Sequence, residues 1–122
     1  MKNYDDEKKA KESQPKKKIW TPSRTVTQEE IRTLNNKWED SPTATMLWEM
    51  ISRYEVKELL EWLTDSPESA FTRSSDGRGP MWWAHEYGHD KIVKILKKVG
   101  VSETLRDKDG IRPIDMTRKS EL

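Results

Sequence analysis

Apolar residues recur at helical spacing in several short stretches of the chain. In the stretch QEEIRTLNNKW, the apolar residues Ile31, Leu34 and Trp38 fall at i, i+3 and i+7, which places them on one face of a helix. Thr27 directly precedes this stretch and is a candidate N-cap. Glu30 lies three residues after Thr27, which is the spacing of a capping box. The pattern predicts a helix that begins directly after Thr27 and docks its apolar face on the rest of the fold.

Two pairs of short helices are predicted further along the chain. The stretches TMLWEMISRY and EVKELLEWL carry apolar residues at helical spacing, and the stretches WWAHEY and DKIVKILKKVG repeat this arrangement. The turn-rich segments TDSPESAFTRSSDGRGP and VSETLRDKDGIRP follow the first and the second pair. The pattern therefore predicts an all-α fold that is built of helix pairs.

The repetition has a measurable period. The turn sequence DGRGP, which begins at Asp76, reappears as DGIRP, which begins 33 residues later at Asp109. This is the period of ankyrin repeats, and DGRGPMWWAHEYGHDKIVKILKKVG resembles one such repeat. The framework positions that match are Pro80, Ala84, Gly88, His89, Ile92, Val93, Ile95, Leu96 and Gly100. The resemblance implies a short ankyrin-like solenoid of about two and a half repeats over residues 19–122, capped by the helix that follows Thr27.

The match departs from the family pattern at several positions. Gly79 replaces the usual threonine and Trp82 the usual histidine, which removes the hydrogen bond between those two side chains. In the first repeat, Trp48 stands where the family has alanine, so we expect the helices there to be pushed apart or shifted in register. The first repeat aligns at an offset of 36, which implies an insertion in TDSPESAFTRSS, and the third repeat stops within DGIRPIDMTRKSEL.

Composition limits the chain to one small domain. It has 122 residues, of which 32% are hydrophobic and 37% charged, and the formal net charge is +1. Residues 1–18 carry seven lysines and four acidic residues, which predicts a disordered tail. No stretch is apolar enough to insert into a membrane, and the absence of cysteine excludes disulfides, thiolate metal sites and cysteine nucleophiles.

The stretch HEYGH has the H-E-x-x-H spacing of zinc metalloproteases, at His85, Glu86 and His89. Such a site needs both histidines on one face of a continuous helix. Gly88 lies between them and is expected to end the first helix, so His85 and His89 would not share a face. We expect no metal site, and a minimal zinc-dependent hydrolase remains the alternative, with Glu103 or Asp107 as its third ligand.

No arrangement of residues indicates catalysis, so we expect a non-enzymatic adaptor or accessory subunit without a cofactor. The resemblance implies that another protein or an extended peptide binds to the concave face and the turn tips. The residues expected to bind this partner are Arg73, Ser75, Asp76, Arg78, Trp82, Glu86, Tyr87, Lys108, Asp109 and Ile111. Their charges alternate in sign, which does not favour a phosphate backbone, so no nucleic acid is expected although PKKK gives that idea weak support.

Two further features bear on binding and on compartment. The chain has six tryptophans, of which we expect Trp38 and Trp83 to be buried. Any of Trp20, Trp62 and Trp82 that remains exposed is a candidate anchor for a partner. The last four residues, KSEL, resemble the K-D-E-L retrieval signal. We therefore expect the lumen of the endoplasmic reticulum if a signal peptide has been removed, and otherwise the cytoplasm or nucleus.

Overall fold

The fold was analysed in a computed structural model, which describes residues 20–116. The predicted disordered tail, residues 1–18, and the KSEL sequence lie outside the described residues. The helices are α1 (Gln28–Asn35), α2 (Pro42–Ser52), α3 (Val56–Asp65), η1 (Pro67–Phe71), α4 (Pro80–Glu86), α5 (Asp90–Val99) and η2 (Pro113–Asp115), where η marks a 3-10 helix. The part of the chain from 20 to 116 is all-α, and its one bridge between extended residues is isolated.

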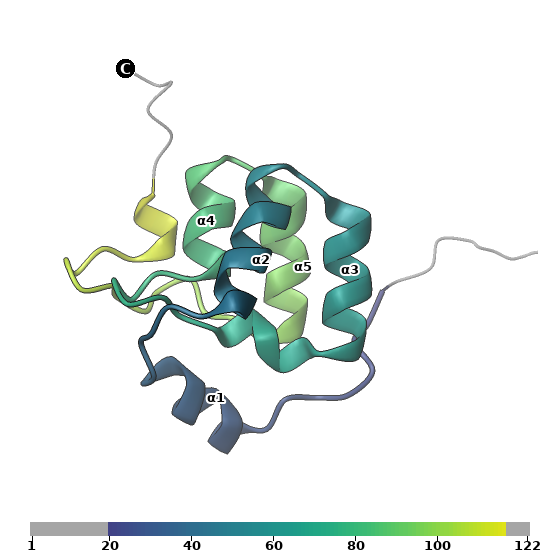
Figure 1. Ribbon diagram of the computed structural model, residues 1–122, viewed down its shortest axis with the longest axis horizontal. Coiled ribbons are helices and arrows are strands. Elements are labelled where there is room, and N and C mark those ends of the chain that lie inside the picture. Colours follow the sequence, from purple (N-terminus) through teal and green to yellow (C-terminus); the bar gives the residue numbers. More distant parts are fainter. Residues whose placement is uncertain (1–19, 117–122) are drawn as a thin grey trace, which may run out of the picture.

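The helices are arranged as two antiparallel pairs, α2 with α3 and α4 with α5 (Figure 1). The first helices of the pairs lie side by side, and η2 lies against α4, so that α4 contacts α2 and η2. The first five residues of α4 are all buried, as befits the central helix of the stack. Within residues 20–116, no helix is long and apolar enough to cross a membrane.

The second helices of the two pairs bury equivalent positions. Leu59 and Leu63 of α3 are fully buried, and so are Ile92 and Leu96 of α5, each 33 residues later. The expected alignment of these helices at an offset of 36 is therefore wrong. The segment expected to hold an insertion instead forms η1, whose proline, alanine and phenylalanine are buried against the helix pairs.

The turns before α4 and before η2 repeat the same backbone hydrogen bonds. Before α4, the N–H of Ser74 donates to the carbonyl of Arg78 at 2.7 Å. Before η2, the N–H of Asp107 donates to the carbonyl of Ile111 at 3.0 Å. All four partners are related by the 33-residue period, so the repetition seen in the sequence is a repetition of structure.

Each of these turns contains a glycine in the left-handed region, Gly77 at a φ of 85° and Gly110 at a φ of 79°. The turns are also stacked, because the N–H of Lys108 donates to the carbonyl of Asp76 at 2.9 Å. A Cβ at Gly79 would collide with the carbonyl oxygen of Thr72. This close approach of the backbone of Thr72 requires glycine at position 79.

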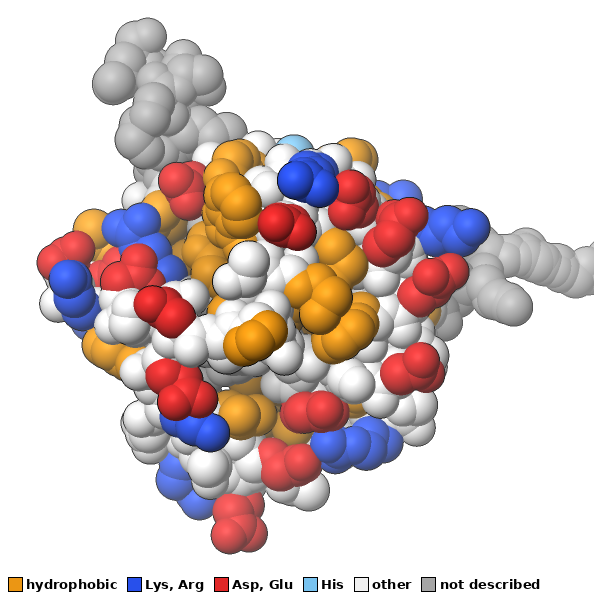
Figure 2. Space-filling model, viewed as in Figure 1, with side chains coloured by type: hydrophobic (Ala, Val, Ile, Leu, Met, Phe, Trp, Pro, Cys, Tyr) orange, Lys and Arg blue, Asp and Glu red, His pale blue; other side chains and the backbone are white. Residues whose placement is uncertain are grey.

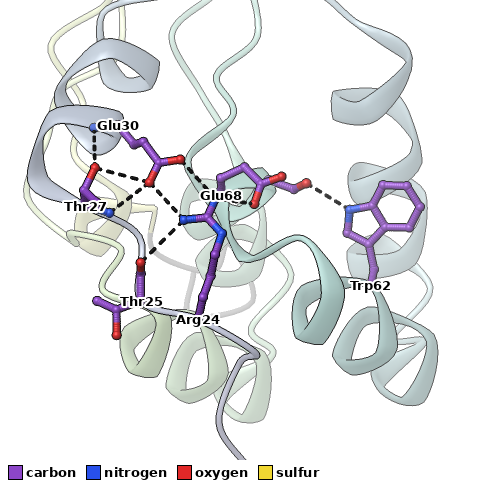
Figure 3. Close-up of polar contacts among 7 residues, drawn as sticks. Arg24, Thr25, Thr27, Glu30, Trp62 and Glu68 are labelled. Atoms are coloured by element: carbon purple, nitrogen blue, oxygen red, sulfur yellow. Dashed lines mark hydrogen bonds and ion pairs between the residues drawn. The ribbon is translucent and has the colours of Figure 1, made fainter.

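Helix α1 is attached by its ends and by partly buried side chains, and none of its residues is buried. The predicted capping box is confirmed, since Thr27 and Glu30 exchange hydrogen bonds at the start of α1. Arg24 ties this helix start to η1 by ion pairs with Glu30 at 3.0 Å and Glu68 at 3.1 Å (Figure 3).

The position of α1 differs from that of a solenoid cap. It packs against η1 and lies below the helix pairs in Figure 1, rather than across α2 and α3. Figure 2 shows hydrophobic side chains open to solvent over α2 and α3 in the same view. The expectation that α1 covers one end of the stacked pairs is therefore not met.

Candidate functional site

A shallow groove lies between the N-terminal halves of α2 and α4 and the turn that precedes α4. Its volume is about 200 Å³. The residues that line it are Asp40, Ser41, Ala44, Thr45, Trp48, Ser74 and Trp83. We call it the Trp48 groove, because the Trp48 side chain is 41% exposed whereas Trp83 on the opposite helix is only 7% exposed.

Local sequence fixes the walls of the Trp48 groove. Ser41 is the N-cap of α2 and its side chain accepts a hydrogen bond from the N–H of Ala44 at 3.1 Å, while Pro42 occupies the first helical position. The carboxylate of Asp40 accepts hydrogen bonds at 3.1 Å from both the N–H and the hydroxyl of Ser75. The start of α2 is thereby joined to the turn before α4.

The side chain of Trp48 lies outside the core. The residues of α2 that enter the core are Ala44, Leu47, Met50 and Ile51. Trp48 instead forms part of the surface, so the family's alanine position is not reproduced in α2. Sequence reasoning marked Trp48 as a departure from the family pattern but gave it no role in binding.

Several carboxylates lie around Arg78, in the turn before α4. Arg78 pairs with Asp107 at 2.8 Å. The hydrogen bond with Asp107 raises the pKa of Arg78 above its ordinary value, and the charges of Asp107, Asp76 and Glu86 raise it further. These carboxylates therefore surround a single guanidinium that is already engaged by one of them.

Asp107 is only 4% exposed and is held by several donors. Its burial works to raise the pKa of its carboxyl, but the hydrogen bonds from Arg78 and from the N–H groups of Ile111 and Asp109 outweigh this effect and lower the pKa. Asp107 thus serves as the centre of the turn rather than as a free surface charge.

The predicted binding residues divide into surface and buried groups. Those exposed to solvent are Ser75, Asp76, Glu86, Tyr87, Lys108 and Asp109, and those partly buried are Arg78 and Ile111. The expectation that Arg73 and Trp82 are presented to a partner is wrong, because they are only 6% and 3% exposed.

Arg73 and Trp82 are part of the scaffold. The Arg73 guanidinium donates to the carbonyl oxygens of Asn35 at 2.9 Å, Gly77 at 2.8 Å and Arg106 at 2.6 Å. The indole N–H of Trp82 donates to the carbonyl of Ile111 at 2.9 Å. These bonds join successive turns, which explains why the two side chains are buried.

Trp38 has an unexpected place in this arrangement. It is 40% exposed, so the prediction that it is buried is wrong, whereas the same prediction for Trp83 is confirmed. The Arg73 guanidinium lies 4.6 Å from the centroid of the Trp38 ring and 4.8 Å from that of Trp82. Trp38 covers a buried cation and remains partly exposed to water.

The two histidines of HEYGH lie on different helices, as the sequence predicts. His85 is on α4, His89 is the N-cap of α5, and Gly88 between them has a φ of 70°. His85 Nε2 lies 2.8 Å from a carboxylate oxygen of Glu103. Within residues 20–116, no three histidine, cysteine or acidic side chains are grouped so that they could hold a metal ion.

The carboxylate of Glu103 is shared between two neighbours. Its second oxygen lies 3.4 Å from the Lys97 ammonium. Burial works to raise the pKa of Glu103, but the hydrogen bonds from His85 and Lys97 lower it more, so that the pKa lies below its ordinary value. Glu103 therefore forms a hydrogen bond with one histidine of the motif, and this bond fastens the segment after α5 to α4.

The ring of His89 lies near two tyrosine rings. Its buried Nε2 has no hydrogen-bond partner among residues 20–116. Its ring instead lies 4.6 Å from that of Tyr54 and 6.1 Å from that of Tyr87. Tyr54 adopts a φ of 59° in the turn between α2 and α3, so this aromatic contact accompanies an unusual backbone conformation.

Comparisons with protein-family models, with curated proteins and with solved structures find no match to this chain.

Proposed function

We propose that this chain is a short ankyrin-like solenoid that binds another protein, without catalysis, through its stacked turns and first helices. The 33-residue repeat of turn hydrogen bonds and the stacking of α2, α4 and η2 support the solenoid. Solenoids of this kind present a continuous surface along one side, and here that surface contains the Trp48 groove.

The observation that carries the proposal is the exposure of Trp48 inside a groove. A tryptophan that is 41% exposed leaves a large apolar surface in water, and Trp83 and Thr45 provide walls for a partner's side chain next to it. Tryptophans in pockets supply much of the binding energy at protein interfaces. Glu86 is the last residue of α4 and Tyr87 is its C-cap. Both are exposed, so they extend the surface beyond the groove.

The experiment is quantitative affinity capture from cells with the full chain, compared with the variant Trp48→Ala. Trp48 lies outside the core, so we expect the variant to keep its circular dichroism spectrum and to lose its partner. Ile114→Ala is the matched control, because Ile114 is a 49% exposed apolar side chain that does not line the groove. Partners retained equally by both variants would contradict binding at the groove.

A second variant tests the rest of the surface. Changing Glu86, Tyr87 and Ile111 together to alanine is expected to weaken the same partner. The compartment of that partner also tests the expectation from KSEL, since a lumenal protein supports the endoplasmic reticulum and a cytoplasmic or nuclear protein contradicts it.

A further inference from the structure

The Trp48 groove is too small for a drug-sized ligand. Its volume of about 200 Å³ falls below the roughly 300–1,000 Å³ that small-molecule pockets have. It is also open along one side between two helix starts, so a single side chain of an extended segment could enter it. The question is which kind of side chain the walls favour.

The walls combine indole rings with a fixed carboxylate. Trp48 and Trp83 supply the apolar surface, and Asp40 supplies the charge. The N–H and the hydroxyl of Ser75 hold the Asp40 carboxylate in place through three contacts, which still leave lone pairs for another donor. Indole faces attract cations, and a carboxylate beside them adds an ion pair.

No basic side chain competes for this carboxylate within the groove. None of the residues that line it is a lysine or an arginine. Asp40 is the one charged side chain among the residues that line the groove. The groove therefore presents a fixed negative charge, which attracts a cation.

We propose that the Trp48 groove binds a lysine or arginine side chain from an extended segment of the partner. The alkyl stem lies on the indoles of Trp48 and Trp83, and the charged end reaches Asp40. This inference rests on the proposed function, because it names the chemistry of the partner that the same surface takes.

The test is selection of peptides from a random dodecapeptide library on the full chain, followed by measurement of the affinity of each peptide for the wild type and for Trp48→Ala. In peptides that depend on Trp48, each lysine is replaced by norleucine and each arginine by citrulline. We expect one such replacement to weaken binding by about tenfold, since it removes the charge and keeps the stem.

Asp40→Asn tests the other side of the contact. The amide oxygen can still accept the hydrogen bonds from Ser75, so the variant removes the charge and keeps the geometry. We expect roughly five- to tenfold weaker binding, and little change for Asp65→Asn, whose residue is exposed at the end of α3 and does not line the groove.

The outcomes separate this inference from the proposed function. Peptides that need Trp48 but bind equally well after every neutral replacement would overturn the cationic side chain and leave binding at the groove in place. Peptides that bind Trp48→Ala as well as the wild type, or a selection that retains no peptide, would overturn both.

Discussion

The guanidinium of Arg73 donates a hydrogen bond of 2.6 Å to the carbonyl of Arg106, the residue that occupies the same place one repeat later. Both arginines also bond the glycine carbonyl of their own turn, Gly77 for Arg73 and Gly110 for Arg106, each at 2.8 Å. Arg73 is buried between neighbouring turns, whereas Arg106 is exposed. The pair therefore allows one side chain to be compared in two environments.

We predict that Arg73→Ala lowers the free energy of unfolding by about 3 kcal/mol, because three carbonyl groups in buried or part-buried hydrogen bonds lose a charged donor. Arg106→Ala removes one exposed hydrogen bond and should cost less than about 1 kcal/mol. Urea denaturation of both variants at pH 7 measures the difference. Equal losses would show that the contacts of Arg73 with neighbouring turns add nothing to stability.

The two turn glycines make a second matched pair. An alanine at Gly77 would place its Cβ 2.9 Å from the Trp38 ring and 3.0 Å from the backbone of Asp107, whereas one at Gly110 would meet nothing within 4 Å. Both changes carry the cost of a positive φ, about 1 kcal/mol. We predict that Gly110→Ala loses about that amount and Gly77→Ala at least twice as much.

Thermal unfolding followed by circular dichroism measures both glycine variants. A Gly77→Ala protein as stable as the Gly110→Ala protein would mean that the first turn moves away from its neighbours at little cost.

The ion pair at the start of α1 makes stability depend on acid pH. The hydrogen bond from Arg24, with a further contribution from the N–H of Thr27, lowers the pKa of Glu30 from 4.5 to about 2. A pKa lowered on folding contributes stability that is complete above about pH 4.5 and is lost as the pH falls toward 2. The attachment of α1 should therefore weaken over that range.

Carbon-detected NMR titration of the Glu30 carboxyl measures this pKa directly. In Arg24→Gln we expect the pKa of Glu30 to move up toward its ordinary value, since the largest cause of the shift is removed. Asp107 serves as the control, because its lowered pKa depends on Arg78, Ile111 and Asp109 and not on Arg24, and this pKa should be the same in both proteins. An unchanged Glu30 titration would assign the shift to the helix start alone.

Metal ions should have no effect on this protein. His85 is paired with Glu103, and His89 lies on the next helix. We predict that neither zinc nor a chelator changes the melting temperature or the secondary structure of the full chain. A clear shift with zinc that is lost in His85→Ala would favour the zinc-dependent hydrolase instead.

The elements that carry strong local signals were predictable from the sequence. The capping box at Thr27 and the break at Gly88 depend on neighbouring residues, and both occur as expected. The D-G turns carry their own conformational requirement, because glycine accepts a positive φ that other residues avoid. The period of 33 residues in the sequence is therefore matched by turn hydrogen bonds that repeat 33 residues apart.

The partners of long side chains could not be predicted in the same way. The sequence indicates only that Arg73 is a charged residue in a turn. In the structure its guanidinium donates hydrogen bonds to carbonyl groups of three different segments of the chain. Trp38 lies at core spacing, yet its role is to cover that guanidinium. The Trp48 groove depends on how α2 is rotated, which local periodicity leaves undetermined because Met46, Leu47 and Met50 each offer an apolar face.

The attachment of α1 also has a dynamic consequence. A helix without a buried residue can open while α2 to α5 keep their core, so its amide hydrogens should exchange with solvent by local opening rather than by global unfolding. Clefts of about 300 and 410 Å³ lie along α1, and Leu34 and Glu68 line both. The shape of these two clefts therefore depends on whether α1 is attached or open, and not only on the packing of α2 to α5.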